Sequence, residues 1–176
     1  MAPFNVNNFK SALINEGARN TLFEVNVPNG IIGMPDTTFL CKAASLPAST
    51  IGMIEVPYFG RKIKVAGDRT FADWTTTIIN LENFEIRNAL MNWMNQINRH
   101  EANIRNSKDL DYKKDVTVTQ YTKNGDVAQQ YVLKNCWPAE VAAIDVDWNN
   151  TDTIEDFTVT WHYDYWVSLL GVSTPA

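Results

Sequence analysis

The chain has 176 residues, of which 45% are hydrophobic and 20% charged, a composition that suits one globular domain and excludes a disordered or fibrous chain. A net charge of −5 argues against general affinity for nucleic acid or anionic membrane, because phosphate binding needs clustered lysine and arginine side chains. The sequence shows neither a secretion signal nor an apolar run long enough to span a membrane, so we expect the protein to stay in the cytosol of the producing cell.

The N-terminal part of the sequence predicts one short helix followed by two strands. Apolar residues at helical spacing over 6–14 predict a helix that is capped by Gly17. Alternation over 22–27 predicts a strand that stops at the Pro-Asn-Gly turn of residues 28–30. Residues 37–44 predict the second strand.

The next segment predicts an extended arm and then a regular strand. Strand-forming residues fill 51–65, but Pro57 and Gly60 interrupt them. Proline cannot donate to a strand ladder and belongs at an edge or a bend, so we expect an arm or hairpin with exposed edges. Residues 74–81 are rich in β-branched side chains and predict a strand.

The second half of the sequence predicts a long helix, a hairpin and a final strand. Apolar residues recur at steps of three and four over 82–98, so this stretch predicts a helix with one buried face. Two alternating runs surround the Asn-Gly turn at 123–126 and predict a hairpin. Odd positions over 157–167 are apolar or aromatic, which predicts one long two-faced strand. Together these elements predict a mainly antiparallel β domain, a sandwich or small open barrel, with one flanking α-helix.

No motif for phosphate or nucleic-acid binding withstands inspection. Gly60 and Gly67 are too far apart for a phosphate loop and lead into a strand rather than a helix. Arg61, Lys62 and Lys64 form a basic cluster, but only two aromatic residues lie close by to stack on bases. A solvated or subunit-facing charge cluster is the better interpretation.

No motif for metal binding or catalysis is convincing either. His100 and His162 lack ligands at a zinc-like spacing. The stretch that begins at Asp145 imitates the start of a calcium loop, but Asn150 stands where the sharp turn needs glycine. His162 and Asp164 read as polar-face residues of a strand rather than part of a catalytic triad. The sequence predicts no metal, no cofactor and no enzymatic activity.

The two cysteines are best interpreted as buried, reduced thiols. Cys41 and Cys136 lie far apart, each in an apolar or strand-like stretch, and free cysteine behaves as a small hydrophobe. A disulfide between them is the alternative.

Six stretches of the sequence carry a family resemblance. They are FLCKAASLPAS at 39–49, AGDRTFADWT at 66–75, EIRNALMNWMN at 85–95, YKKDVTVTQY at 112–121, CWPAEV at 136–141 and VTWHYDYW at 159–166. With these stretches the chain resembles the tail tube proteins of contractile-tailed, myovirus-type bacteriophages along nearly its whole length.

The resemblance implies a single tail tube domain over 1–176, with an extended inter-subunit arm at about 46–64. It implies hexameric rings stacked into a tube inside a contractile sheath, in the virion tail, assembled in the cytoplasm of the bacterial host. The implied partners are further copies of the chain, the sheath protein, the baseplate tube initiator and the tail terminator. DNA would pass through the channel without sequence-specific binding, and no membrane is involved. The alternatives are the tube of a related contractile injection or secretion system, or a soluble β-sandwich binding module.

The resemblance also implies candidate contact residues. Gly67, Asp68 and Arg69 would turn the chain from the arm into the next strand. The candidates for subunit contacts are Ile51, Met53, Ile54, Tyr58, Arg61, Lys62 and Lys64 on the arm, with Asp145, Asp147 and Asp152 as their acidic counterparts. Because polar walls let DNA slide, the candidates for the channel wall are the strand threonines Thr75, Thr77, Thr117 and Thr119, with Thr158 and Thr160 as further ones.

Overall fold

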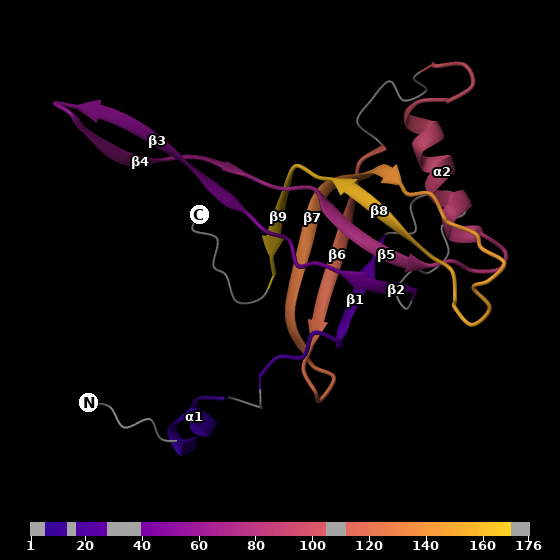
Figure 1. Cartoon of the computed structure of the whole chain (residues 1–176), viewed down its shortest axis with the longest axis horizontal. Helices are drawn as coiled ribbons and strands as arrows, with labels where there is room; N and C mark the ends of the chain where they lie inside the picture. The colour runs from indigo at the N-terminus through magenta and orange to yellow at the C-terminus, as the bar shows by residue number, and fades with distance from the viewer. Residues whose placement is uncertain (1–5, 14–16, 28–39, 105–111, 170–176) are drawn as a thin grey trace.

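The structure is a computed structural model that describes residues 6–13, 17–27, 40–104 and 112–169 (Figure 1). Its elements in chain order are α1 (Val6–Ala12), β1 (Phe23–Asn26), β2 (Cys41–Ala44), β3 (Thr50–Tyr58), β4 (Arg61–Thr70), β5 (Trp74–Ile79), α2 (Glu85–Ile97), β6 (Lys114–Tyr121), β7 (Val127–Val141), β8 (Asp156–His162) and β9 (Tyr165–Ser168). The prediction of a mainly antiparallel β fold with one main helix is confirmed.

Seven of the strands form one curled sheet. Their order is β1-β6-β7-β8-β5-β2, and β9 adds a further pairing to β7. All pairings are antiparallel. The two ends of this order, β1 and β2, come close without pairing, so the sheet curls toward a barrel that stays open.

Strand β7 holds the two halves of the sheet together. Its first part pairs with β6 on one side and with β9 on the other, and its last part pairs with β8. Between these parts Asn135 has a left-handed backbone, with φ of 58°. Pro138 lies next to a register shift, where a strand tolerates proline. One bent strand therefore belongs to both halves.

The core lies inside the curl and is closed by α2. Tryptophans dominate it: Trp93 of α2 packs against Trp161 of β8, which packs against Trp74 of β5. The polar atoms of these rings are satisfied, because Trp161 Nε1 donates to Thr76 Oγ1 at 2.9 Å and Trp93 Nε1 donates to the Tyr112 carbonyl at 2.8 Å. The buried face of α2 is the one that the sequence predicts.

The β3–β4 hairpin does not join this sheet. It projects from the body as a separate two-stranded ribbon and forms one end of the molecule in Figure 1. Every residue of β3 is exposed, and so is nearly all of β4. The ribbon ends at residue 70, beyond the limit expected for the arm.

Two sequence expectations need correction, each for a physical reason. The final strand is not continuous, because the chain breaks at Tyr163 and Asp164 between β8 and β9, and the alternation of buried residues shifts there. The expected turn at Gly67, Asp68 and Arg69 is wrong, since these residues lie within β4. A Cβ on Gly67 would come within 3.2 Å of the backbone of Gly52, so this glycine permits a close approach of two strands rather than a turn.

Smaller differences concern the ends of elements. Helix α1 ends at Ala12, well before Gly17, and α2 begins at Glu85, three residues later than expected. The β6–β7 hairpin is confirmed, with Gly125 at positive φ in its turn. Ile14, the expected turn at 28–30 and the first residues of the expected strand at 37–44 lie outside the described residues.

The tryptophan core gives a first prediction. Replacing the fully buried Trp93 with alanine should lower the free energy of unfolding by about 3–5 kcal/mol, because it removes a large side chain and leaves a cavity. Trp148→Ala is the matched control, since that ring is 99% exposed and its loss should change stability by less than about 0.5 kcal/mol. Chemical denaturation followed by circular dichroism measures both, and equal losses would contradict the core assignment.

Candidate assembly interface

The arm has two chemically different faces. Paired residues of an antiparallel ribbon share a face, and the register pairs Val56 with Ile63 and Ile54 with Val65. These four aliphatic side chains, each about half exposed, form what we call the apolar face of the arm. The other face carries the pairs Glu55–Lys64 and Pro57–Lys62.

This register divides the predicted basic cluster. Lys62 and Lys64 lie on the charged face, where Lys62 Nζ donates to Glu55 Oε2 at 2.6 Å. Arg61 pairs with Tyr58 at the far end of the apolar face. Among the described residues, no ion pair involves Arg61. The three cations that the sequence groups together therefore cannot all contact one partner surface through the same face.

A tight turn at the tip of the arm fixes the register. Phe59 and Gly60 both have positive φ, 42° and 76°, as in the type I′ turns whose twist matches that of the strands they join. The Phe59 side chain is 92% exposed, and its ring contacts only the edge of Tyr58, at 4.7 Å between ring centroids. The tip is thus both aromatic and open to solvent.

The loop between β7 and β8 is the acidic counterpart. Asp145, Asp147 and Asp152, the acidic candidates for subunit contacts, are all exposed on it. Asp147 shapes the loop, because its Oδ1 accepts hydrogen bonds from the Asn149 backbone N–H at 2.9 Å and from Asn149 Nδ2 at 3.1 Å. The carboxylates therefore lie on a defined turn.

Three apolar residues of the same loop were not singled out from the sequence. Val146, Trp148 and Ile154 are 87%, 99% and 75% exposed, and we call them the loop tip. A large exposed tryptophan in a short acidic loop is unusual for a free surface. The alternation of acidic and apolar residues in DVDWNNTDTI is the available signal, but the same stretch also imitates the start of a calcium loop, which obscures it.

The curled sheet also has open edges. β1, β9 and β2 each pair with one neighbour, and no second strand covers them among the described residues. Unpaired edges offer backbone donors and acceptors to another chain. β1 and β9 are the two borders of the four-stranded half β1-β6-β7-β9.

The four threonines proposed for a channel wall separate into two pairs. Thr75 and Thr77 of β5 lie opposite Thr160 and Thr158 of β8, on the outer face of one half of the sheet. Thr117 and Thr119 lie on the outer face of the other half, opposite to the core residues Val116 and Val118 of β6, but there Thr117 is half-buried and Thr119 is buried. Since both halves turn their buried faces toward one core, their outer faces point in different directions.

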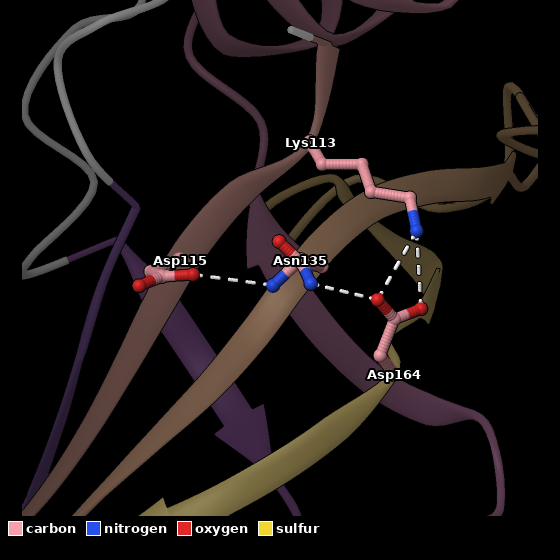
Figure 2. Close-up of polar contacts among 4 residues, drawn as sticks. All are labelled: Lys113, Asp115, Asn135 and Asp164. Carbon is pink, nitrogen blue, oxygen red and sulfur yellow. Dashed lines mark hydrogen bonds and ion pairs between the residues drawn. The ribbon is translucent and has the colours of Figure 1, made fainter. Parts of the chain in front are cut away.

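A polar cluster pins the place where the sheet bends (Figure 2). Lys113 Nζ donates to both carboxylate oxygens of Asp164 at 3.1 Å, and Asn135 Nδ2 donates to Asp164 Oδ2 at 2.7 Å. The Asn135 backbone N–H donates to Asp115 Oδ1 at 3.1 Å, and Lys134 Nζ donates to Asp115 Oδ2 at 2.6 Å. These bonds tie the break before β9 to the bend in β7.

The same contacts perturb the carboxyl group of Asp115. Partial burial raises its pKa, but the hydrogen bonds from Lys134 and Asn135, with the charge of Lys134, outweigh burial and bring the pKa below its ordinary value. The pKa of Lys134 is raised, mainly by its hydrogen bond to Asp115. The folded state therefore favours both groups in their charged forms.

Catalytic geometry is not found where the sequence offered candidates. His162 contacts Asp73, with Nδ1 2.7 Å from Oδ1, whereas Asp164 binds Lys113. Both cysteines are free thiols, as predicted, and burial raises the pKa of Cys41 to about 11 and of Cys136 to about 12. Within the described residues, no group of three potential metal ligands gathers, and no helix is long and apolar enough to span a membrane.

Comparison with known proteins decides the family. The model of the family described as phage tail tube protein matches residues 4–169. Tail tube protein gp19 of Enterobacteria phage T4 is 37% identical over 150 residues, which cover 85% of this chain and 90% of that protein. The chain belongs to the phage tail tube protein family. It is therefore a structural protein of a phage tail and not an enzyme, as the sequence analysis predicted.

Two further relatives agree with this family assignment. The tail tube protein of Serratia phage KSP90 is 28% identical over 128 residues, which cover 73% of this chain and 72% of that protein. The fold is shared with a chain of an extracellular contractile injection system, the PVC sheath–tube complex in its extended state, with a TM-score of 0.67 at 16% identity. That match covers 90% of this chain and 95% of the other. The tail tube family thus accounts for both the sequence and the fold.

The polar cluster at the bend of the sheet, which contains Asp115, gives a second prediction. A carboxylate whose pKa is lowered by folding stabilises the fold above its unfolded pKa of about 3.9, and this contribution is lost as the pH falls through the folded value. Asp115→Asn should therefore lose stability less steeply than the unmodified chain when the pH is lowered below about 4. Thermal unfolding across this pH range measures the slope, and Asp126→Asn in the exposed β6–β7 turn is the control. A slope identical to that of the unmodified chain would contradict the role given to Asp115.

Proposed function

We propose that the chain forms hexameric rings that stack into the tube of a contractile phage tail, with a central channel for the genome. The observation that best supports this proposal is that both borders of the four-stranded half β1-β6-β7-β9 are open. Three successive antiparallel pairings make β1 and β9 run in opposite directions. The β9 border of one copy can therefore add to the β1 border of the next as one more antiparallel pair.

Ring closure would remove these open edges. A head-to-tail contact that closes on itself makes a ring, and a sheet that closes has no edge left. Six copies with four strands each would give about 24 strands spaced ~4.8 Å apart, and at a tilt of roughly 40° the barrel would measure ~50 Å between backbones. After allowance for side chains, such a barrel leaves room for a DNA duplex.

This arrangement selects one pair of threonines for the channel wall. The inner surface of the ring would be the outer face of the four-stranded half, which carries Thr117 and Thr119, together with Glu24 and Gln130. These side chains are neutral or acidic, and Lys134 on the same face is paired with Asp115, so this wall would not retain DNA through counterion release. Thr75 and Thr77 lie on the other half, away from this wall.

The arm and the proposed partners complete the assembly. Ile51, Met53, Ile54 and Tyr58 are all more than half exposed, which suits residues that a neighbouring copy covers. The acidic loop residues Asp145, Asp147 and Asp152 are proposed as polar contacts toward a neighbouring copy. The proposed partners of the tube are the sheath protein on its outside, the baseplate initiator at its lower end and the tail terminator at its upper end. DNA would pass through the channel. Assembly would take place in the host cytoplasm.

Pairing between the β1 border and a neighbouring copy requires backbone N–H groups that point away from β6. The Tyr121 N–H donates to the Leu22 carbonyl at 2.9 Å, so these two residues form a bonded pair of the β1–β6 ladder. Bonded pairs alternate along an antiparallel ladder, so the N–H of Phe23 points away from β6, toward the open border. The neighbouring copy would use this donor.

Phe23→Pro tests the proposal. Proline removes the outward N–H while leaving the β1–β6 ladder intact, because an edge strand tolerates proline at such a position. Phe23→Ala is the matched control, since it loses the same ring but keeps the N–H. We expect both variants to fold, and only the alanine variant to form rings or tubes in negative-stain electron microscopy.

Two results would count against the proposal. If the unmodified chain stayed monomeric at high concentration with baseplate components present, ring formation would be refuted. If both Phe23 variants assembled equally well, pairing through the β1 border would be refuted, and the ring would have to close through other contacts.

A further inference from the structure

Two surfaces of the protein expose more apolar side chain than a free subunit should. One is the apolar face of the arm, formed by Ile54, Val56, Ile63 and Val65. The other is the loop tip, which is the set of exposed apolar residues between β7 and β8. Each of the two is left uncovered by the described residues of its own chain, although apolar area of this kind is normally buried in an interface.

The charges around these surfaces are complementary. The apolar face of the arm has one cation at its far end, Arg61, beside the aromatic Tyr58. The loop tip is interrupted by carboxylates at Asp145 and Asp147, with Asp152 nearby on the same loop. A guanidinium that approaches these carboxylates can bind them through paired hydrogen bonds and can also stack on an indole ring such as Trp148. The charged face of the arm offers no comparable apolar area.

The positions of the two surfaces exclude contact within one subunit. In Figure 1 the arm extends to one end of the longest axis, and the loop after β7 lies at the opposite end, beside α2. Complementary surfaces at opposite ends of a molecule join copies head to tail. The two surfaces therefore suit a contact between different copies of this chain.

We propose that the apolar face of the arm docks on the loop tip of another copy, with Arg61 placed between Asp145 and Asp147. The inference rests on the proposed assembly into a tube and specifies which face of the arm is covered and what covers it. It gives the exposed Trp148 a role as the anchor of the contact. Lys62 and Lys64 then face away from this contact.

Cysteine cross-linking tests the contact in the assembled protein. Arg61→Cys and Asp147→Cys are combined in a Cys41→Ser background, since Cys136 is fully buried. A disulfide needs its two Cβ atoms about 4 Å apart, which is closer than an arginine–aspartate pair holds them, so a short bis-maleimide is used to span the two thiols. Treatment of assembled tubes with this reagent should give a ladder of linked subunits on a denaturing gel, and blocking the thiols beforehand should abolish it.

The matched control moves one cysteine by a single residue. Lys62→Cys with Asp147→Cys places the thiol on the charged face of the arm and should give several-fold less linked product. A second, independent test exchanges the charges. Arg61→Asp should weaken assembly, and Arg61→Asp combined with Asp147→Arg should restore it.

The outcomes separate this inference from the proposed function. Linked subunits that depend on position 61, together with rescue by the charge exchange, support the contact. Tubes that form normally but link equally well from position 62, or not at all, would overturn it and leave the tube intact. Protection of Trp148 from hydroxyl-radical oxidation only after sheath protein is added would overturn the contact as well. Failure of the unmodified chain to form any ring would overturn the tube proposal itself.

Discussion

A two-stranded ribbon cannot bury its own side chains, and this constraint determines which surfaces a single copy of the protein leaves exposed. Most strands here gain their stability from the common core, but β3 and β4 touch no second layer. Cross-strand pairs such as Val56–Ile63 contribute to the hairpin, yet they leave the apolar face in contact with water. In a single copy the hairpin therefore keeps this apolar area exposed to water. The open edges of the curled sheet have the same property, because their backbone groups are satisfied by water alone in a single copy.

The bend in β7 connects this requirement to the interior of the domain. Both halves of the sheet turn one face toward the core that α2 closes, the β1-β6-β7-β9 half presents two open borders, and β7 belongs to both halves. The angle between the halves depends on the left-handed backbone at Asn135 and on the bonds that Asp164 accepts from Asn135 and Lys113 (Figure 2). These hydrogen bonds matter because they fix the packing of Trp161 on one side of the bend and the direction of β9 on the other side at the same time. A shift at this junction would alter the core and the open edge together.

The sequence could predict the elements whose pattern is local. Helix α2 and the β6–β7 hairpin follow from residue spacing and an Asn-Gly turn, and the core face of β8 follows from its alternation. The break at Tyr163 was not predictable, because the alternation of side chains continues through it and only the contact of Asp164 with Lys113, which lies just before β6, reveals the bend. The prediction of a turn at Gly67 was wrong for a related reason. Glycine serves turns and close strand contacts alike, and only the register shift opposite Gly52 decides between them. Strand alternation alone already separates Arg61 from Lys62 and Lys64, but the pairing of these cations with Tyr58, Pro57 and Glu55 across the hairpin required the turn geometry.

The turn at the arm tip shows how much of the candidate interface depends on two residues. Because side chains alternate along a strand, a slip of one residue at the turn would move the aliphatic side chains to the charged face. Phe59 occupies a backbone region that costs an ordinary residue about 1 kcal/mol or more, and asparagine would fit the same place with less strain. Its ring also lies almost wholly in solvent. In the isolated subunit the ring gains only its contact with Tyr58 in return for this strain. The proposed assembly would account for the aromatic residue, because the tip of the arm, like its apolar face, would then be covered by another copy.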